Sequence, residues 1–156
     1  MARRGVVAGM ALTGTYVPSK AEWVRKQVEQ YEASGGQEAN TLPGTKYPIV
    51  VVTSVGAKSG NLRKNPVMRV ERDGAYLAVA SKGGAPDNPE WYYNFVAHPE
   101  VDLQDGPEKK TYRAERVEGE ERADLWKLAV DTWATYGEYQ KKTEREIPVF
   151  LLEPKD

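Results

Sequence analysis

Tight turns between apolar runs constrain the fold of this chain more than any other feature of its sequence. Asp73-Gly74 separates the runs at residues 67–72 and 75–80, and this dipeptide is typical of a two-residue hairpin. Asp105-Gly106-Pro107 predicts a second hairpin further along the chain. Parallel strands need a crossover of about a dozen residues or more, for which these turns leave no room. We therefore expect an antiparallel barrel with appended helices rather than a doubly wound sheet.

The other elements follow from the hydrophobic pattern and from capping residues. The β-branched run at residues 49–55 does not alternate, as expected for a strand buried on both faces. Ser19 to Glu22 has the form of a capping box, and Gly35-Gly36 ends the helix that follows. Asn88 is predicted to cap a short helix with Pro89 at its first position. The expected strands are residues 49–55, 67–72, 75–80, 101–104, 111–117 and 147–152, and the expected helices are 19–34, 89–98 and 120–136.

The composition excludes several classes of chemistry. The 156 residues fit one domain of ordinary size. The absence of cysteine excludes disulfides, thiolate metal sites and thiol nucleophiles. His98 is the only histidine, so a Ser-His-Asp triad or a histidine metal site would depend on it alone. The net charge of −1 argues against a chain built around nucleic acid, and we expect neither a metal nor a nucleic-acid partner.

The first 40 residues are expected to form a tail and a helix outside the barrel domain, and this helix must dock on the domain or on something else because it cannot bury its own apolar face. Residues 1–12 combine two arginines with a short apolar run, which is far below the ~20 residues that span a bilayer. They lack a clear signal-peptide cleavage site, and we expect a flexible tail. Residues 37–44 are polar and contain a proline, as in a linker. The chain is therefore divided into a tail with an amphipathic helix, residues 1–40, and a barrel domain, residues 41–156.

A glycine-containing loop at residues 56–66 is the first candidate site. Residues 46–70 contain five basic side chains and no acid. Glycines allow backbone N–H groups to turn toward a ligand, and Lys58 and Arg63 supply positive charge. A guanidinium can hold a phosphate or carboxylate through two hydrogen bonds. The pattern fits either an anion site or a solvated hairpin turn.

The segment from Ser81 to Asn94 is the second candidate site. A strand end, a Gly-Gly loop and a helix start bring together a hydroxyl, a lysine and N–H donors, which attract anions or polarised carbonyls. Trp91 and Asn94 are three residues apart and share one face of the predicted helix. Trp91 and Phe95 fit equally well in the core beneath the barrel.

An aromatic stripe is the third candidate. Trp133, Tyr136 and Tyr139 are spaced by three and share one face if the last long helix continues through them. Such a stripe is more often packing than a ligand site, but a buried phenol needs a polar partner. The position of Tyr136 beside Gly137 leads us to expect a phenol exposed to a pocket.

Three segments of the chain resemble the deazaflavin-dependent nitroreductases of actinobacteria. They are AKSGNLRKNPV, AVASKGGAPDNPEWYYNFVAHPEV and TYGEYQKKTEREIPVFLLEP. The resemblance extends over residues 45–154, and its most specific part is the pattern SKGG…NPxWYxN. It implies a mainly β fold with helices (α+β), a split β-barrel of the flavin-reductase or FMN-binding type. It also implies coenzyme F₄₂₀ as cofactor, an 8-hydroxy-5-deazaflavin with a phospholactyl and oligoglutamate tail.

The resemblance also implies roles for individual residues. The cofactor's tail phosphate would lie at Lys58, Ser59 and Arg63, and its path would follow residues 65–68. Ser81 is the candidate for polarising the ring or the acceptor. Tyr136 would face the substrate side of the ring and donate a hydrogen bond or proton to the acceptor oxygen. The expected cofactor-binding residues are Ala57, Lys58, Ser59, Arg63, Lys64, Asn65, Pro66, Val67, Met68, Val79, Ala80, Ser81, Lys82, Glu90, Trp91, Tyr92, Tyr93, Asn94 and Tyr136.

The implied activity is hydride transfer from reduced F₄₂₀ to a quinone, or to a nitroaromatic or nitroimidazole compound. Trp133 and Met68 depart from the pattern of the drug-activating members. Two alternatives are an FMN-dependent split-barrel reductase, with Lys58 and Arg63 on the FMN phosphate, and a carrier that binds deazaflavin without turning it over. By similarity, residues 19–34 would make peripheral contact with a membrane, which implies a cytoplasmic protein associated with the inner face of the membrane.

Overall fold

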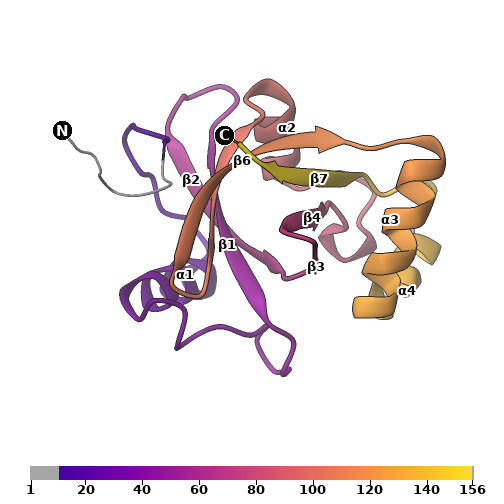
Figure 1. The fold of residues 1–156 in the computed structure, drawn as a ribbon, viewed down its shortest axis with the longest axis horizontal. Helices are drawn as coiled ribbons and strands as arrows, with labels where there is room; N and C mark the ends of the chain where they lie inside the picture. The colour runs from indigo at the N-terminus through magenta and orange to yellow at the C-terminus, as the bar shows by residue number, and fades with distance from the viewer. Residues whose placement is uncertain (1–10, 156) are drawn as a thin grey trace.

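The computed structural model describes residues 11–155, which form one curled antiparallel sheet with helices packed around it (Figure 1). The tail expected at residues 1–12 lies almost wholly outside the described residues. The helices are α1 (Glu22–Ala33), α2 (Glu90–Ala97), α3 (Gly119–Thr132) and α4 (Thr135–Lys141), with a 3₁₀ turn, η1, at Lys82–Gly84. The strands are β1 (Ile49–Val55), β2 (Leu62–Met68), β3 (Glu71–Arg72), β4 (Ala75–Val79), β5 (Glu100–Asp105), β6 (Glu108–Arg116) and β7 (Val149–Pro154).

The sheet has seven strands in the order β2-β1-β5-β6-β7-β4-β3, and every pairing is antiparallel. Its curl brings β2 back into contact with β4 near the opposite edge. Helices α3 and α4 cover the side of β4 and β7, and α1 lies against β2 (Figure 1). The expected α+β fold, a split antiparallel barrel with appended helices, is confirmed.

The predictions are confirmed for the apolar run of β1 and for the Asp73-Gly74 turn. β1 has the predicted bounds, and Asp73 and Gly74 have φ values of 55° and 85°, as a tight hairpin turn requires. The strand predicted at residues 67–72 is right only at its end, where β3 (Glu71–Arg72) pairs with β4 across the turn; its start belongs to β2, which begins at Leu62, five residues before the predicted start, and ends at Met68. Its residues 63–66 are polar and include Pro66, which an edge strand tolerates because its outer N–H needs no ladder partner.

Both predicted N-caps are wrong by one or two positions. Ala21 occupies the N-cap of α1, and the Ser19 hydroxyl accepts the Ala21 N–H at 3.1 Å instead of capping the helix. Pro89 occupies the N-cap of α2, one position later than predicted. The Asn88 side chain accepts a hydrogen bond from Arg145 at 2.8 Å, so a tertiary contact has replaced the cap.

The predicted C-terminal end is confirmed for α1 and is wrong for the helix expected at residues 120–136. Gly36 N–H donates to Tyr31 O at 2.8 Å and Gly35 N–H donates to Glu32 O at 3.3 Å, which is a Schellman motif at the predicted stop. The helix predicted at residues 120–136 is interrupted at Trp133, whose φ and ψ are −146° and 101°. The chain resumes as α4, so the three aromatic residues do not lie on one helix.

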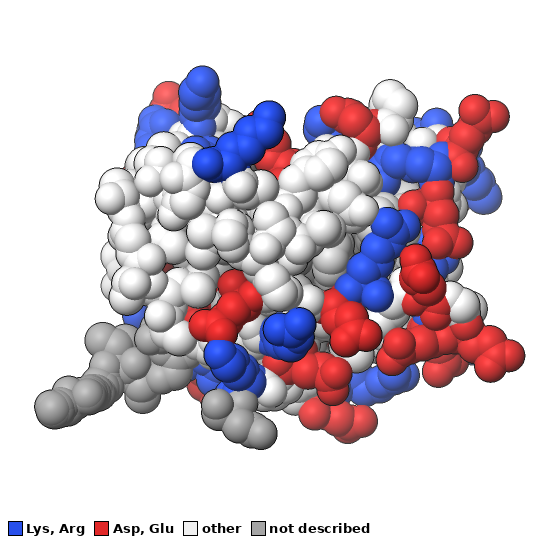
Figure 2. All heavy atoms as spheres, turned by 90° about the horizontal axis from the view of Figure 1, so that it is seen from above, with Lys and Arg blue, Asp and Glu red and all other residues white. Residues whose placement is uncertain are grey.

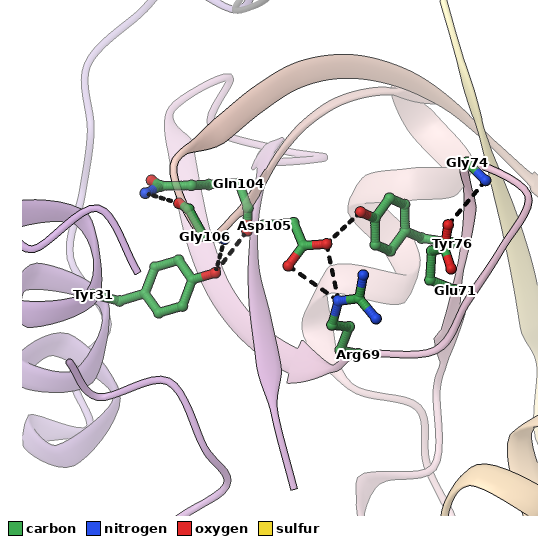
Figure 3. A network of polar contacts seen from close by, with 8 residues as sticks. All are labelled: Tyr31, Arg69, Glu71, Gly74, Tyr76, Gln104, Asp105 and Gly106. Atoms are coloured by element: carbon green, nitrogen blue, oxygen red, sulfur yellow. Dashed lines mark hydrogen bonds and ion pairs between the residues drawn. The ribbon is translucent and has the colours of Figure 1, made fainter. Parts of the chain in front are cut away.

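Helix α1 shares the main core of the barrel. Val28 and Tyr31 are 0% and 1% exposed and pack in the same cluster as Val51 of β1. The Tyr31 hydroxyl accepts the Gly106 N–H at 2.7 Å and donates to Gln104 O at 3.2 Å (Figure 3). This helix is therefore held by burial and by hydrogen bonds to the β5–β6 turn.

A second network on Asp105 connects segments that are distant along the chain (Figure 3). Arg69, just after β2, donates its Nε–H to Asp105 at 2.9 Å, and the Tyr76 hydroxyl of β4 donates to the same carboxylate at 2.5 Å. Burial, and then the hydrogen bond to Asp105, raise the pKa of Tyr76. The carboxylate thus joins the end of β2 to β4, which are near opposite edges of the sheet.

Candidate functional site

A pocket of about 560 Å³ opens between the β1–β2 connection and α2. It brings together two of the three candidate segments, although they lie some thirty residues apart in the sequence. Its lining residues are Gly56, Ala57, Lys58, Ser59, Arg63, Glu90, Tyr93 and Asn94. Seven of these are among the residues expected to bind the cofactor, and Gly56 is the addition.

The loop at residues 56–61 is held in shape by its own backbone and by α2. The Gly56 N–H donates to Asn61 O at 2.7 Å, and a Cβ on Gly56 would lie 2.6 Å from the Ser59 hydroxyl oxygen. A larger residue at position 56 would therefore require the Ser59 side chain to shift. The buried Asn94 accepts the Ala57 N–H at 2.9 Å. Asn94 thus ties the loop to α2 and keeps the two walls of the pocket at a fixed separation.

The charges in this pocket favour an anion. Lys58 is exposed and Arg63 is half-buried, and neither forms an ion pair within residues 11–155. Glu90 is the one acid among the lining residues. Two cations without a carboxylate partner among the described residues form a site that suits phosphate.

Lys64 points away from this pocket. Its Nζ lies 2.6 Å from a carboxylate oxygen of Glu32 on α1 and 4.7 Å above the ring of Tyr16. Arg63 and Lys64 are consecutive in β2, and consecutive side chains of a strand point to opposite faces. The expectation that Lys64 belongs with the cofactor-binding side chains is therefore not supported by its contacts.

The strip at residues 65–68 is divided in the same way. Met68 packs in one core cluster with Val79 and Tyr136, whereas Val67 packs against the other cluster, as Trp91 and Tyr92 also do. A continuous lining by all four side chains, as expected from the resemblance, would need them on one face. Trp91 also contacts Phe95, with ring centroids 4.8 Å apart. Part of the Trp91 ring is therefore packed in the core, which is the alternative role that the sequence allowed for this residue.

The segment around Ser81 lies between β4 and α4. Ala80 and Ser81 are buried, and a Cβ on Gly84 would lie 2.7 Å from the carbonyl oxygen of Tyr139. The second and third candidate segments therefore touch. The Lys82 ammonium lies 2.8 Å from Asp87, which lowers the pKa of that exposed carboxyl. Lys82 thus already has a partner on its own loop.

Tyr136 is buried, not exposed to a pocket as we expected. Its side chain is 4% exposed, and its ring lies 5.0 Å from that of Trp133 and 6.4 Å from that of Trp126. Trp133 also contacts Tyr139 at 5.6 Å, so the predicted aromatic cluster forms across the break between α3 and α4. Burial raises the pKa of Tyr136, which keeps the phenol protonated as a donor.

Sequence reasoning missed Arg145, which donates hydrogen bonds into the Ser81 loop. It stands in the run Lys141-Lys142-Thr143-Glu144-Arg145-Glu146, and such a run is typical of a solvated surface. Nothing local in the sequence distinguishes this arginine from its charged neighbours.

The surface charge is unevenly distributed. Acidic side chains gather on the half of the molecule that carries α3 and α4, and much of the other half of the visible face is uncharged (Figure 2). The acidic half is the one farther from β2 and its Arg63. An anionic ligand at the pocket is therefore separated from the acidic side chains of the α3 and α4 half.

Comparison with known proteins gives consistent matches. A family model described as F₄₂₀H₂-dependent quinone reductase matches residues 23–154. An F₄₂₀H₂-dependent quinone reductase of Mycobacterium tuberculosis is 34% identical over 125 residues, which are 78% of this chain and 83% of that protein.

Two solved structures are also similar. The structure of an F₄₂₀H₂-dependent reductase (FDR-A) is 53% identical, with a TM-score of 0.65 over 68% of this chain and 94% of that one. A structure described as a domain-swapped dimer is 46% identical, with a TM-score of 0.68 over 86% of this chain and all of that one (100%).

Proposed function

Because the chain belongs to the F₄₂₀H₂-dependent quinone reductase family, we propose that it is an oxidoreductase that transfers a hydride from reduced coenzyme F₄₂₀ to a quinone. The observation that carries this proposal is the pocket between the 56–61 loop and α2. Its cations Lys58 and Arg63 have no ion-pair partner among the described residues, as a site for a phosphate-bearing cofactor requires.

The residues present fit a deazaflavin with an anionic tail. Lys58, Ser59 and Arg63 would hold the tail phosphate, with the charge of Arg63 directed into the pocket by the alternation of β2. The buried turn at Ala80 and Ser81 would form the wall for the ring. When bound, the reduced cofactor supplies a hydride from a carbon centre, so the protein's tasks are binding, orientation and charge stabilisation.

Ser81 and Tyr136 are the proposed polar groups at the reacting end. The Ser81 hydroxyl and the N–H groups of its turn would polarise the ring or the acceptor. Tyr136, neutral because burial raises its pKa, would donate a hydrogen bond or proton to the acceptor oxygen. Because Tyr136 is 4% exposed, this role requires that the packing around its ring, which includes Trp126 and Trp133, open to the acceptor.

A binding titration followed by turnover tests the proposal. Purified protein is titrated with F₄₂₀ and, in parallel, with FMN, and oxidation of F₄₂₀H₂ is then followed with a panel of quinones and nitro compounds. We expect tighter binding of F₄₂₀ than of FMN, and turnover with at least one quinone. Equal affinity for the two cofactors would favour the FMN-dependent alternative, and binding without turnover would favour the carrier. Nitro compounds are included as proposed secondary acceptors.

We also propose that residues 19–34 make peripheral contact with the inner face of the membrane. Among the described residues, no helix has the length and apolar character needed to cross a bilayer. Trp23 on α1 is 56% exposed, beside Lys26, whereas Val28 and Tyr31 face the core. Full-length protein should sediment with anionic vesicles at low salt, and Trp23→Ala should weaken that association without affecting turnover of a soluble quinone. Protein that stays in the supernatant would refute this contact.

A further inference from the structure

Arg145 makes an unusual set of contacts between α4 and β7. Its Nε donates to Ala85 O at 2.9 Å, and its Nη2 donates to Ser81 O at 2.9 Å. Its Nη1 donates to Asn88 Oδ1 at 2.8 Å and to Ala80 O at 3.2 Å. All four acceptors lie within residues 80–88, so one side chain from a distant part of the chain holds a single loop.

The loop that Arg145 holds is strained. Lys82, Gly83 and Gly84 have φ values of 45°, 64° and 84°, three consecutive residues in the left-handed region. A lysine there carries a steric cost that glycine does not, and such residues persist only where surrounding contacts hold them. Within the loop, only two backbone bonds close the turn, from Gly84 N–H to Ser81 O and from Ala85 N–H to Lys82 O.

The contacts of Arg145 flank this turn on both sides. Ala80 and Ser81 precede the left-handed residues, and Ala85 follows them. The bond to Asn88 then reaches the residue before the N-cap of α2, the helix that forms one wall of the pocket. One guanidinium therefore couples the turn carrying Ser81 to the helix carrying the pocket residues.

The chemistry of this contact depends on the guanidinium fork and not on charge alone. Arg145 forms no ion pair with the described residues, and its four acceptors are neutral oxygens. A lysine ammonium would keep the charge, but its compact head has three donors at one point and cannot reach acceptors spread over the loop. This difference provides a conservative variant that removes the fork only.

We infer that Arg145 is a positioning residue, which holds the Ser81 turn and the start of α2 in the relative placement that F₄₂₀ binding requires. The inference rests on the proposed function, because it concerns the same cofactor site. It adds a residue that lies outside the candidate cofactor-binding set and that acts through the loop rather than on the cofactor.

The test compares Arg145→Lys with a matched control, Arg122→Lys. Arg122 also donates from Nη2 to a backbone oxygen, Ile147 O at 2.7 Å, and its ion pair is with Glu146, so among the described residues it has no hydrogen bond or ion pair with residues 80–88. Hydrogen exchange is measured by mass spectrometry on the full-length protein without cofactor, and F₄₂₀ dissociation constants are measured by fluorescence. For Arg145→Lys, we expect exchange in residues 80–88 to be faster by about tenfold and the dissociation constant to rise by about tenfold. For Arg122→Lys, we expect neither change, even if its melting temperature falls as much.

Wild-type exchange and wild-type affinity in Arg145→Lys would overturn the inference, as would equal effects in the two variants. If Arg145→Lys does not fold, Asn88→Ala removes a single acceptor of the fork, and we expect faster exchange at the start of α2 with an affinity loss of about threefold. An Asn88→Ala variant without either effect would also overturn it. Failure of the wild-type protein to bind F₄₂₀ would refute the proposed function. The exchange measurement, in contrast, tests whether Arg145 holds residues 80–88, and it does not require the cofactor.

Discussion

Replacing Arg63 by alanine should weaken F₄₂₀ binding strongly, whereas the same change at the adjacent Lys64 should not. The two residues carry the same charge, and they differ in the face of β2 from which they project. Arg63 lines the pocket and has no ion-pair partner among residues 11–155, whereas Lys64 is paired with Glu32 on α1. The comparison therefore separates a local charge effect from a general loss of positive charge.

The expected magnitudes follow from these environments. Loss of a charged hydrogen bond to the cofactor phosphate costs about 1.5–3 kcal/mol, which raises the dissociation constant of Arg63→Ala by roughly 10- to 150-fold. The Lys64–Glu32 pair is mostly buried, with side-chain exposures of 20% and 27%, and Lys64 also lies over the Tyr16 ring. Its removal should cost about 1 kcal/mol of unfolding free energy and lower the melting temperature by roughly 2–4 °C.

The assay is a fluorescence titration of both variants with F₄₂₀ at two salt concentrations, with thermal unfolding of each. Wild-type affinity should fall as salt rises, and Arg63→Ala should show a weaker salt dependence because one phosphate contact is gone. Lys64→Ala should bind within about twofold of the wild type, a difference below 0.5 kcal/mol. Equal losses of affinity in the two variants, or unchanged binding in Arg63→Ala, would refute the assignment of this pocket to the cofactor phosphate.

Three further predictions concern buried tyrosines and the carboxylate that anchors one of them. As the general acid, Tyr136 should matter for turnover and not for binding, so Tyr136→Phe should lower kcat by about 10²-fold or more with little change in F₄₂₀ affinity. An unchanged kcat would exclude Tyr136 as the proton donor and leave Ser81 as the proposed polar group. Burial raises the pKa of Tyr136 above its ordinary value of 10.0, so its contribution to stability is complete below pH 10.0 and is lost as the pH rises further. Urea unfolding between pH 8 and 11 should therefore show a shallower alkaline decline for Tyr136→Phe, and identical slopes would contradict this assignment. Asp105→Ala leaves the Arg69 and Tyr76 donors without their shared acceptor and should lower the unfolding free energy by about 2–3 kcal/mol; a loss below about 0.5 kcal/mol would show that this network does not stabilise the barrel.

The predictions that were confirmed depend on short-range signals. The turn at Asp73-Gly74 and the Schellman motif at Gly35-Gly36 require particular backbone angles, and those angles restrict the residues that can occupy the positions. The strand over residues 49–55 was predictable because its apolar side chains face the core on both sides. β2 could not be predicted in this way because its sequence is polar and contains Pro66. A strand with such a sequence is tolerated here because β2 lies at the edge of the sheet.

The basic stretch at residues 46–70 shows where such reasoning stops. In the sequence its charges form one group. In the structure, Lys64 and Arg69 are paired with Glu32 and Asp105, whose positions lie 32 and 36 residues away. Of the three other basic residues, Lys58 and Arg63 line the pocket and are available to a ligand, whereas Lys46 does not line it. A count of charges cannot make this division, because the neutralising acids belong to other elements.

By itself, the sequence determined that the sheet is antiparallel and that the 56–61 loop and the Ser81–Asn94 segment carry the candidate chemistry. These properties follow from turn residues and local composition, which act over a few positions. Only the tertiary structure decided that the two segments share one pocket, that Tyr136 is buried and that Arg145 holds the Ser81 loop. Each of these depends on contacts between elements far apart in the chain, and in such contacts the face of a strand and the reach of a side chain decide which groups meet.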